Sequence, residues 1–167
     1  MEIDDIHSLF SNSSGISTDT RTIKNKNIFF CLKGQNFNGN LFIDQAISLG
    51  ASFVIYDEEK LNHKSEKAIK VKNALETLQA LAKYHRSKFN IPVIGLTGSN
   101  GKTTSKELIN SVLSQKFNVT STLNNFNNHI GVPLTILEIN RKTDLAIIEM
   151  GANHLGEIRL LCNIADP

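Results

Sequence analysis

Hydrophobic and polar positions in the first 90 residues alternate between a helical and a strand-like pattern. Ile3, Ile6, Leu9 and Phe10 recur at the spacing of one helix face. This spacing predicts a helix over 2–10. Two later segments predict helices over 41–49 and 73–89. Short apolar runs bounded by polar residues predict buried strands over 27–32, 52–56 and 68–71.

Turn-forming residues mark where these elements begin and end. Asn40 is expected to cap the helix over 41–49, after a loop at 34–40, and Gly50 is expected to close that helix. His85 lies on an apolar helical stripe, where we expect it to pack against neighbours rather than bind a ligand. Pro92 disfavours helix at the preceding residue, so we place a domain boundary between residues 89 and 90.

Beyond this boundary, predicted strands and helices alternate. Strands are expected over 93–98, 117–122 and 144–150, and helices over 102–115, over 156–165 and shortly after Pro133. Such alternation is typical of a parallel sheet in a doubly wound domain. We therefore predict an α/β fold: a small N-terminal α/β domain, 1–89, followed by the first part of a mostly parallel α/β domain, 90–167.

Composition and charge exclude several classes of protein. The chain has 167 residues, of which 40% are hydrophobic and 20% charged, as expected for an ordinary globular protein with one or two domains. With 18 basic and 16 acidic side chains the net charge is +2, too balanced to indicate nucleic acid or an anionic membrane as the main partner. The first residues lack the pattern of a secretory signal, and the apolar runs are too short to span a bilayer. Cys31 and Cys162 are expected to be free, buried thiols, which suits a cytoplasmic location.

The stretch T-G-S-N-G-K-T-T, residues 97–104, carries the most specific chemistry in the chain. It follows a predicted strand and opens a predicted helix, where backbone N–H groups can surround a phosphate. The usual Walker spacing would place a glycine at Leu96, but the glycines here are Gly98 and Gly101. We expect Lys102 to reach the β- and γ-phosphates of ATP and Thr103 to offer its hydroxyl to Mg²⁺. The alternative is a strand–turn–helix junction with coincidental glycines.

Glu149 supplies a second candidate ligand for Mg²⁺. It follows three apolar residues near the end of the predicted strand D-L-A-I-I-E-M, where a buried carboxylate is costly unless it is paired or binds a metal. Because the carboxyl ends of parallel strands meet at one edge of a sheet, Glu149 should face the same crevice as the glycine loop. An ordinary hydrogen-bonded carboxylate remains the alternative.

The loop resembles the ATP loop of the Mur ligases, the ATP-dependent amide-forming enzymes that build the peptidoglycan stem peptide. Residues 17–51, the stretch N-F-N-N-H-I-G-V-P and the stretch E-M-G-A-N-H-L-G-E-I resemble the branch of this family that adds D-alanyl-D-alanine. The resemblance covers nearly the whole chain. It implies ATP and Mg²⁺ as cofactors, with UDP-N-acetylmuramoyl-tripeptide and D-alanyl-D-alanine as substrates. It also implies that ATP phosphorylates the substrate carboxylate, and that the amine then attacks the resulting acyl phosphate.

The resemblance assigns roles to residues at matching positions. ATP would contact Gly98, Ser99, Asn100, Gly101, Lys102, Thr103 and Thr104, and Mg²⁺ would contact Thr103 and Glu149. The residues implied at the reaction centre are Lys102, Asn125, Asn127, Asn128 and His154. Substrate contacts are implied for Ser17, Thr18, Asp19, Thr20, Arg21, Lys33, Gly34, Asn38, Gly39 and Asn153. Arg21 could equally form a surface salt bridge, and for His154 a polar contact is favoured over a role as general base.

Members of this family have three domains and several hundred residues, so this chain is expected to lack most of the catalytic machinery and to be inactive alone. The full-length enzyme is expected to be a monomer, whereas an incomplete sheet with an exposed edge favours self-association of this chain. Two alternatives are a P-loop kinase or NTPase of another kind and a non-catalytic nucleotide-binding module. The first alternative gives the asparagine-rich stretch at 124–128 no evident role, and the second would be favoured if ATP bound without a metal at Thr103 and Glu149.

Overall fold

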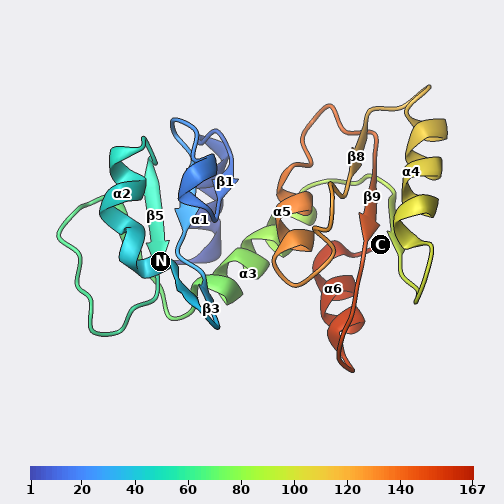
Figure 1. Ribbon diagram of the computed structural model, residues 1–167. Helices are drawn as coiled ribbons and strands as arrows, with labels where there is room; N and C mark the ends of the chain where they lie inside the picture. Colours follow the sequence, from blue (N-terminus) through green and yellow to red (C-terminus); the bar gives the residue numbers. More distant parts are fainter. The chain divides into compact units, whose positions relative to one another are not determined.

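The computed structural model describes residues 1–167, which form two compact units, Met1–Leu78 and Gln79–Pro167. Both units combine parallel strands with helices (Figure 1), so the predicted α/β class is confirmed. The helix α3 (Ala74–Arg86) contains residues of both units, and the boundary expected between residues 89 and 90 stays a prediction. None of the helices combines the length and the apolar character that crossing a bilayer requires.

A parallel sheet of four strands forms the centre of the first unit, in the order β1-β2-β5-β6. These strands are β1 (Ile16–Ser17), β2 (Ile28–Phe30), β5 (Phe53–Tyr56) and β6 (Ala68–Lys70). Phe29 of β2 pairs with Val54 of β5, and both side chains are fully buried. The three predicted strands over 27–32, 52–56 and 68–71 are therefore present, and Ile16–Ser17 adds one that the hydrophobic pattern did not predict.

The helices of the first unit are α1 (Ile3–Ser11), the 3₁₀ turn η1 (Thr20–Thr22), the 3₁₀ turn η2 (Gly39–Phe42) and α2 (Ile43–Ser48). The prediction for 34–40 was wrong, because this segment contains most of a small antiparallel hairpin, β3 (Lys33–Gly34) and β4 (Phe37–Asn38). Asn40 does not cap α2, which begins at Ile43. The buried Asn40 amide instead donates to Asn38 Oδ1 and Asp57 Oδ1. Gly50 follows α2 at a φ of +101°, as its predicted role requires.

Three parallel strands form the sheet of the second unit, in the order β7-β9-β8. They are β7 (Val93–Leu96), β8 (Val119–Ser121) and β9 (Leu145–Glu149), and every residue of the central β9 is buried. The helices are α4 (Lys102–Leu113), α5 (Gly131–Leu137) and α6 (Glu157–Ala165). Figure 1 shows α4 on one face of this sheet and α5 with α6 on the other, the doubly wound arrangement that the sequence predicts.

Two side chains near the end of α3 pack within the second unit. His85 is 7% exposed and its Nε2 lies 2.7 Å from the carbonyl oxygen of Ile139, which confirms its predicted packing role. Burial lowers the pKa of His85, although the hydrogen bond to Ile139 acts in the opposite direction. Arg86 is also buried, and its guanidinium donates to four backbone carbonyls, those of Phe89, Ile91, Ala165 and Asp166.

The helix expected after Pro133 begins two residues earlier, at Gly131. Proline is tolerated in a first turn because its missing N–H has no partner there. Gly131 is needed at this position, since a Cβ would lie 2.3 Å from the Cα of Phe126. The start of α5 is therefore decided by close packing against the preceding loop, which the apolar pattern does not reveal.

Both cysteines are free thiols, as predicted, but they differ in exposure. Cys31 is fully buried, whereas Cys162 is only half-buried, which corrects the expectation that both are buried. Burial, aided by the nearby Asp57 carboxylate, raises the pKa of the Cys31 thiol to about 12. Cys31 is therefore a neutral core side chain.

Candidate functional site

The glycine loop connects β7 to α4. Gly98 has a φ of +145° and Gly101, the N-cap of α4, a φ of +76°, conformations that a side chain would strain. Lys102 Nζ donates to the carbonyl oxygen of Gly98 at 2.5 Å, so the lysine folds back over the loop. Gly98, Ser99, Asn100 and Gly101 are exposed, and the first N–H groups of a helix such as α4 can bind an anion.

Glu149 lies at the carboxyl end of β9, beside this loop, and is 1% exposed. Its Oε1 accepts hydrogen bonds from Thr103 Oγ1 at 3.1 Å and from Asn127 Nδ2 at 2.9 Å. Its Oε2 is buried and has no hydrogen-bond partner. A buried carboxylate oxygen without a partner is costly, and a cation would satisfy it.

The residues present fit Mg²⁺, which prefers oxygen ligands from one or two carboxylates together with phosphate and water. Thr103 offers a hydroxyl and Glu149 an unsatisfied carboxylate oxygen. No cluster of three or more His, Cys, Asp or Glu side chains could hold a metal ion by itself. A cation here would therefore depend on a bound phosphate group for part of its coordination.

The asparagine-rich segment between β8 and α5 lies against the same carboxylate. The Asn127 side chain donates to Glu149, and the Asn127 backbone carbonyl oxygen accepts a hydrogen bond from the Gly151 N–H at 2.7 Å. The Asn128 side chain accepts bonds from the N–H groups of Ile130 and Gly131, and so orders the entry to α5. Asn127 thus contacts the candidate metal ligand directly, whereas Asn128 shapes the loop.

A cavity of about 650 Å³ opens beside these groups. Seven predicted site residues line it: Ser99, Lys102, Asn125, Asn127, Asn128, Asn153 and His154. His129, Gly151, Ala152, Glu157, Leu160 and Leu161 complete the lining. The structure therefore brings together site residues from the glycine loop, the asparagine-rich segment and the stretch after β9.

The start of α6 holds Asn153 and His154 in place. Their backbone N–H groups donate to Glu157 Oε2, at 2.6 Å for Asn153 and 3.1 Å for His154. These two hydrogen bonds, the one from Asn153 first, lower the pKa of Glu157, which is therefore a carboxylate at neutral pH. Glu157 is a site residue that sequence reasoning missed, although an acidic residue in a first helical turn is a recognisable capping signal.

Three further residues around the site were missed. Gly151 lies so close to Asn127 that a Cβ would be 3.2 Å from the amide. Lys106 and Thr122 are each 1% exposed, and the Lys106 ammonium donates to the Thr122 carbonyl oxygen. The lysine falls on the same helix face as Thr103, but its burial could not be deduced from a pattern in which lysine counts as polar.

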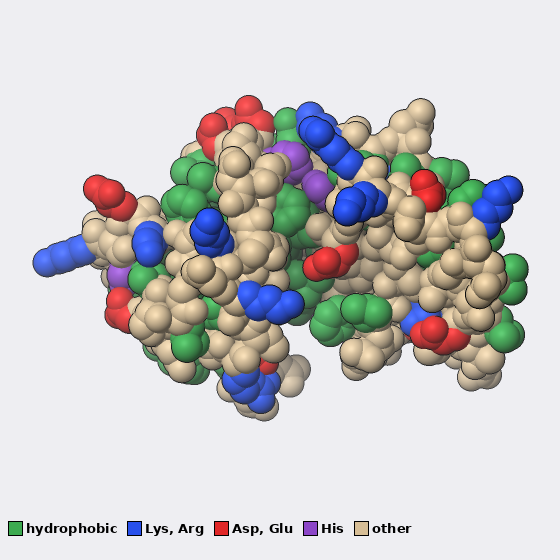
Figure 2. Space-filling model, turned by 90° about the horizontal axis from the view of Figure 1, so that it is seen from above, with side chains coloured by type: hydrophobic (Ala, Val, Ile, Leu, Met, Phe, Trp, Pro, Cys, Tyr) green, Lys and Arg blue, Asp and Glu red, His purple; other side chains and the backbone are tan.

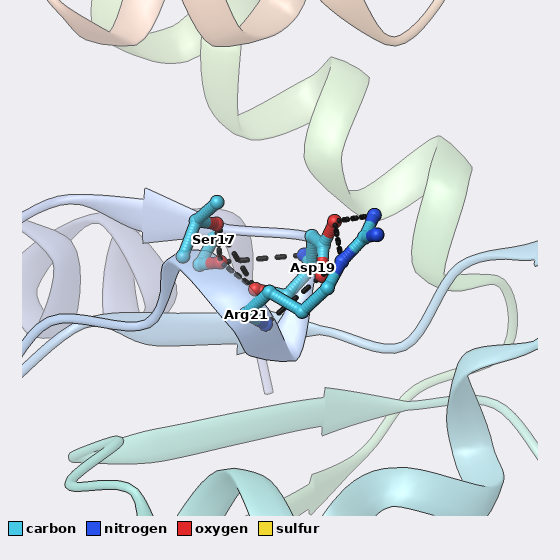
Figure 3. Close-up of polar contacts among 4 residues, drawn as sticks. Ser17, Asp19 and Arg21 are labelled. Carbon is cyan, nitrogen blue, oxygen red and sulfur yellow. Dashed lines mark hydrogen bonds and ion pairs between the residues drawn. The ribbon is translucent and has the colours of Figure 1, made fainter.

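In the first unit, the residues after β1 form a hydrogen-bonded turn (Figure 3). The buried Ser17 hydroxyl donates to the Asp19 carbonyl at 2.8 Å. Arg21 Nε lies 3.0 Å from each Asp19 carboxylate oxygen, and Nη2 lies 2.5 Å from Oδ2. The Arg21 side chain is 86% exposed, and its hydrogen bond lowers the pKa of Asp19. Arg21 thus forms a surface ion pair, which was the sequence-based alternative to a substrate contact. Thr18 and Thr20 belong to the same turn.

The segment after β2 lies at the same edge of the sheet. Lys33 Nζ lies 3.3 Å from Asp57 Oδ1 and 3.4 Å from Glu58 Oε2, both just after β5. Gly34 is exposed, and Asn38 Oδ1 accepts from the Asn40 backbone and side chain. Gly39 packs so tightly that a Cβ would lie 2.8 Å from the Cα of Cys31. Because β1, β2 and β5 are adjacent and parallel, these loops gather at their carboxyl ends.

Asp57 links these loops and was not singled out in the sequence. Its carboxylate accepts from the Ala74 N–H at 3.0 Å and the Asn40 amide at 3.1 Å, besides its ion pair with Lys33. Burial acts to raise the pKa of Asp57, but these three partners lower it below the ordinary value. Asp57 follows an apolar strand just as Glu149 does, so the rule that located Glu149 would also have located Asp57.

Charge is spread rather than concentrated around these regions. Figure 2 shows Lys and Arg side chains scattered among Asp and Glu on the face in view, without one large patch of either sign. This distribution agrees with the net charge of +2. It also agrees with an anion site formed by backbone N–H groups and a few Lys or Arg side chains.

A glycine loop between a strand and a helix, beside a carboxylate at the end of the adjacent parallel strand, defines an α/β protein of the phosphate-loop class. Residues 12–86 match the model "Mur ligase family, catalytic domain", and residues 96–167 match the model "Mur ligase middle domain". The chain belongs to the Mur ligase family.

Two similar curated proteins share the name UDP-N-acetylmuramoyl-tripeptide–D-alanyl-D-alanine ligase. The protein from Bacillus subtilis is 44% identical over 154 residues, which are 92% of this chain and 34% of the relative. The protein from Synechocystis is 45% identical over 156 residues, with the same two coverages. This chain therefore spans about a third of the length of the curated relatives it matches.

Solved structures agree with this assignment. A crystal structure of MurF from Acinetobacter baumannii matches with a TM-score of 0.85 and 34% identity, over 93% of this chain and 34% of that one. The MurF ligase from Thermotoga maritima in complex with ADP matches with a TM-score of 0.80 and 34% identity, over 90% of this chain and 35% of that one. The fold is that of the N-terminal and central regions of these ligases.

Proposed function

We propose that this chain supplies two parts of an ATP-dependent amide ligase of peptidoglycan precursor synthesis. Residues 1–89 would bind the UDP-muramoyl peptide, and residues 90–167 would form an incomplete ATP-binding domain. The reaction would join D-alanyl-D-alanine to UDP-N-acetylmuramoyl-tripeptide, in the cytoplasm. The observation that carries this proposal is the buried Glu149 carboxylate, held by Thr103 and Asn127 beside the glycine loop, with one oxygen unsatisfied.

The proposed chemistry begins with a carboxylate, which is a poor acyl donor. Transfer of the γ-phosphoryl group of ATP would convert it to an acyl phosphate, which the incoming amine attacks with loss of phosphate. The site must therefore hold two anions close together, and positive charge and backbone N–H groups lower that repulsion. We assign this role to Lys102, whose ammonium lies at the loop, and to the exposed loop backbone. Mg²⁺, when bound, would neutralise further phosphate charge.

For the nucleotide, we propose that the loop from Gly98 to Thr104 holds the phosphates and that Thr103 and Glu149 hold the cation. The related MurF from Thermotoga maritima was crystallised in complex with ADP, which supports binding of an adenine nucleotide by this chain. Asn125, Asn127 and Asn128 suit the neighbourhood of the γ-phosphate because amides donate hydrogen bonds without adding negative charge. We assign His154 a polar contact in the same cavity.

For the uridine nucleotide, we propose the turn Ser17–Arg21 and the hairpin residues Lys33, Gly34, Asn38 and Gly39. The support is their common position at the carboxyl edge of the first sheet, where α/β proteins bind ligands. Lys33 lies near Asp57 and Glu58 and remains 44% exposed, so its ammonium can also reach an anionic ligand.

Calorimetric titration of the 167-residue chain tests this proposal. We expect UDP-N-acetylmuramoyl-tripeptide to bind more tightly than UDP, and ATP to bind more tightly with Mg²⁺ than with EDTA. Binding of ATP without any binding of the muramoyl peptide would favour a kinase or NTPase of another kind. Equal ATP affinities in Mg²⁺ and in EDTA would favour a non-catalytic nucleotide-binding module.

A phosphate-release assay with all three substrates tests the expected inactivity of these residues alone. The chain spans 34% of the Bacillus subtilis relative, so most of the groups that such a ligase carries lie outside the aligned part. We expect no phosphate release above that of a Lys102→Met control. Turnover above this control would show that residues 1–167 suffice for catalysis.

A further inference from the structure

Lys106 is a buried cation that the proposed function does not use. It lies on α4, one turn after Lys102, and is 1% exposed. Burying an ammonium group costs free energy unless the group is paired and hydrogen-bonded. A methionine or leucine would fill the same space without that cost, so the charge itself needs an explanation.

The Lys106 ammonium joins α4 to the end of β8. Its Nζ donates to the carbonyl oxygen of Thr122 at 2.6 Å and lies 2.8 Å from Oε1 of Glu107, which faces solvent. Thr122 directly follows β8, and its N–H donates to the carbonyl oxygen of Ile147 on β9. A hydrogen bond from a charged donor is shorter and stronger than a neutral one, so this contact fixes the helix firmly against the sheet.

Thr122 in turn contacts Glu149. The Glu149 N–H donates to Thr122 Oγ1 at 3.0 Å. Three residues before Lys106 on the same face of α4, Thr103 donates to the Glu149 carboxylate. The helix that opens the phosphate loop is therefore connected to Glu149 twice, directly through Thr103 and indirectly through Lys106 and Thr122.

We propose that Lys106 is a positioning residue that sets the separation between the phosphate loop and the Glu149 carboxylate. This inference rests on the proposed function, because the site concerned would take a nucleotide phosphate together with a divalent cation. Groups that orient metal ligands without touching the metal typically change metal affinity by about 10- to 100-fold when they are lost. Lys106 acts in this way through Thr122, without contacting the nucleotide itself.

The first test compares ADP affinity in Mg²⁺ and in EDTA for the whole chain. Lys106→Met removes the ammonium and keeps an apolar side chain of similar length, and we expect the affinity gained from Mg²⁺ to fall by about tenfold. Lys106→Arg keeps a charged donor and is expected to retain that gain within about threefold. Lys116→Met, at an exposed lysine beyond the end of α4, is the matched control and should leave the gain unchanged.

The second test needs no nucleotide. In Lys106→Met, we expect amide hydrogen exchange at Glu149 and Thr122 to be faster by at least about tenfold, while the β7 amides exchange as in the wild type. The proposal would be overturned if Lys106→Met lost stability uniformly while Mg²⁺ still raised its ADP affinity as in the wild type. Unchanged amide hydrogen exchange at Glu149 would also overturn it. If the wild type bound no ADP, the proposed function would fail, and hydrogen exchange would still decide the role of Lys106.

Should Lys106→Met fail to fold, Lys106→Gln takes its place in both measurements. Glutamine keeps a neutral N–H donor on a shorter side chain, so it should weaken the contact with Thr122 without leaving an empty core position. The expected changes have the same direction and a smaller size. Wild-type behaviour of this variant in both measurements would count against a positioning role.

Discussion

Glu149 combines a position inside the sheet with an unsatisfied acceptor. One carboxylate oxygen accepts both hydrogen bonds, from Thr103 and Asn127, while the other is buried without a partner. Such an arrangement destabilises the empty protein, and groups of this kind concentrate at functional sites. At this residue, stability and ligand binding are therefore expected to oppose each other.

Glu149→Gln tests that opposition. The amide keeps the shape and an acceptor for Thr103 and Asn127 but removes the charge, so we expect Mg²⁺ to lose its effect on nucleotide affinity. We also expect the free energy of unfolding to rise by about 1 kcal/mol, because an unpaired buried amide costs less than an unpaired buried carboxylate charge. Calorimetry and denaturant titration measure the two effects, and Glu138→Gln on the exposed surface is the control. A variant that is less stable and keeps the Mg²⁺ effect would contradict this account.

At the scale of elements, short hydrogen-bonded connections hold the loops of the first unit in place. The Asp57 side chain, just after β5, binds the hairpin through Lys33, the 3₁₀ turn η2 through Asn40 and the first turn of α3 through Ala74. The strands contribute only two to four residues each, so these polar contacts decide the loop conformations. The proposed uridine-nucleotide region therefore depends on one carboxylate.

Asp57→Asn is expected to lower the free energy of unfolding at pH 7 by about 1–3 kcal/mol, because it removes an ion pair and one buried acceptor. The pKa of Asp57 is lowered by folding. Its contribution is therefore fully present above the unfolded value of about 3.9 and is lost as pH falls through the lower folded value. The stabilities of wild type and variant should converge below about pH 4 in denaturant titrations. Glu59→Gln, at an exposed neighbour, should show no difference at pH 7.

Gly131→Ala tests the packing between the asparagine-rich segment and α5. The new methyl group would lie 2.3 Å from the Cα of Phe126, and backbone atoms cannot move aside cheaply. We expect a loss of about 3 kcal/mol or more in the free energy of unfolding. Gly34→Ala is the matched control, because nothing lies within 4 Å of a Cβ at Gly34. Equal stabilities of the two variants in thermal unfolding would refute the packing argument.

At the scale of the whole molecule, each proposed binding region lies within one compact unit. The turn after β1 and the hairpin belong to Met1–Leu78, and the glycine loop and its cavity belong to Gln79–Pro167. Each unit has its own parallel sheet and presents its loops at the carboxyl ends of the strands. The two ligands should therefore respond to different substitutions.

Lys33→Met and Lys102→Met test this separation. We expect Lys33→Met to weaken binding of UDP-N-acetylmuramoyl-tripeptide by about tenfold and leave ATP binding unchanged, and Lys102→Met to do the reverse. Both variants replace a lysine by an apolar side chain of similar length, so each serves as the control for the other. Calorimetric titration with both ligands measures the four affinities. Loss of both ligands in one variant would contradict independent sites.

Much of the fold could be predicted from local chemistry. Apolar runs and helical stripes located all six predicted strands and the principal helices within a few residues, because burial against a sheet or a helix imposes a fixed period. The same rule placed Glu149 at a strand end and Thr103 at a helix start, and the structure joins them at 3.1 Å. The hairpin at 33–38 was missed, since Phe37 is its only large apolar side chain and most of its residues are exposed.

By itself, the sequence determined the α/β class, the position of the glycine loop and the resemblance to the Mur ligases, because these depend on the order and spacing of residues. Only the tertiary structure decided which polar side chains are buried. The local pattern does not mark Lys106, Asn40 or Thr122 as buried, yet each is at most 4% exposed and hydrogen-bonded to a group distant in sequence. Partners 16 to 27 residues away become neighbours only when the strands pair, so no local pattern encodes them.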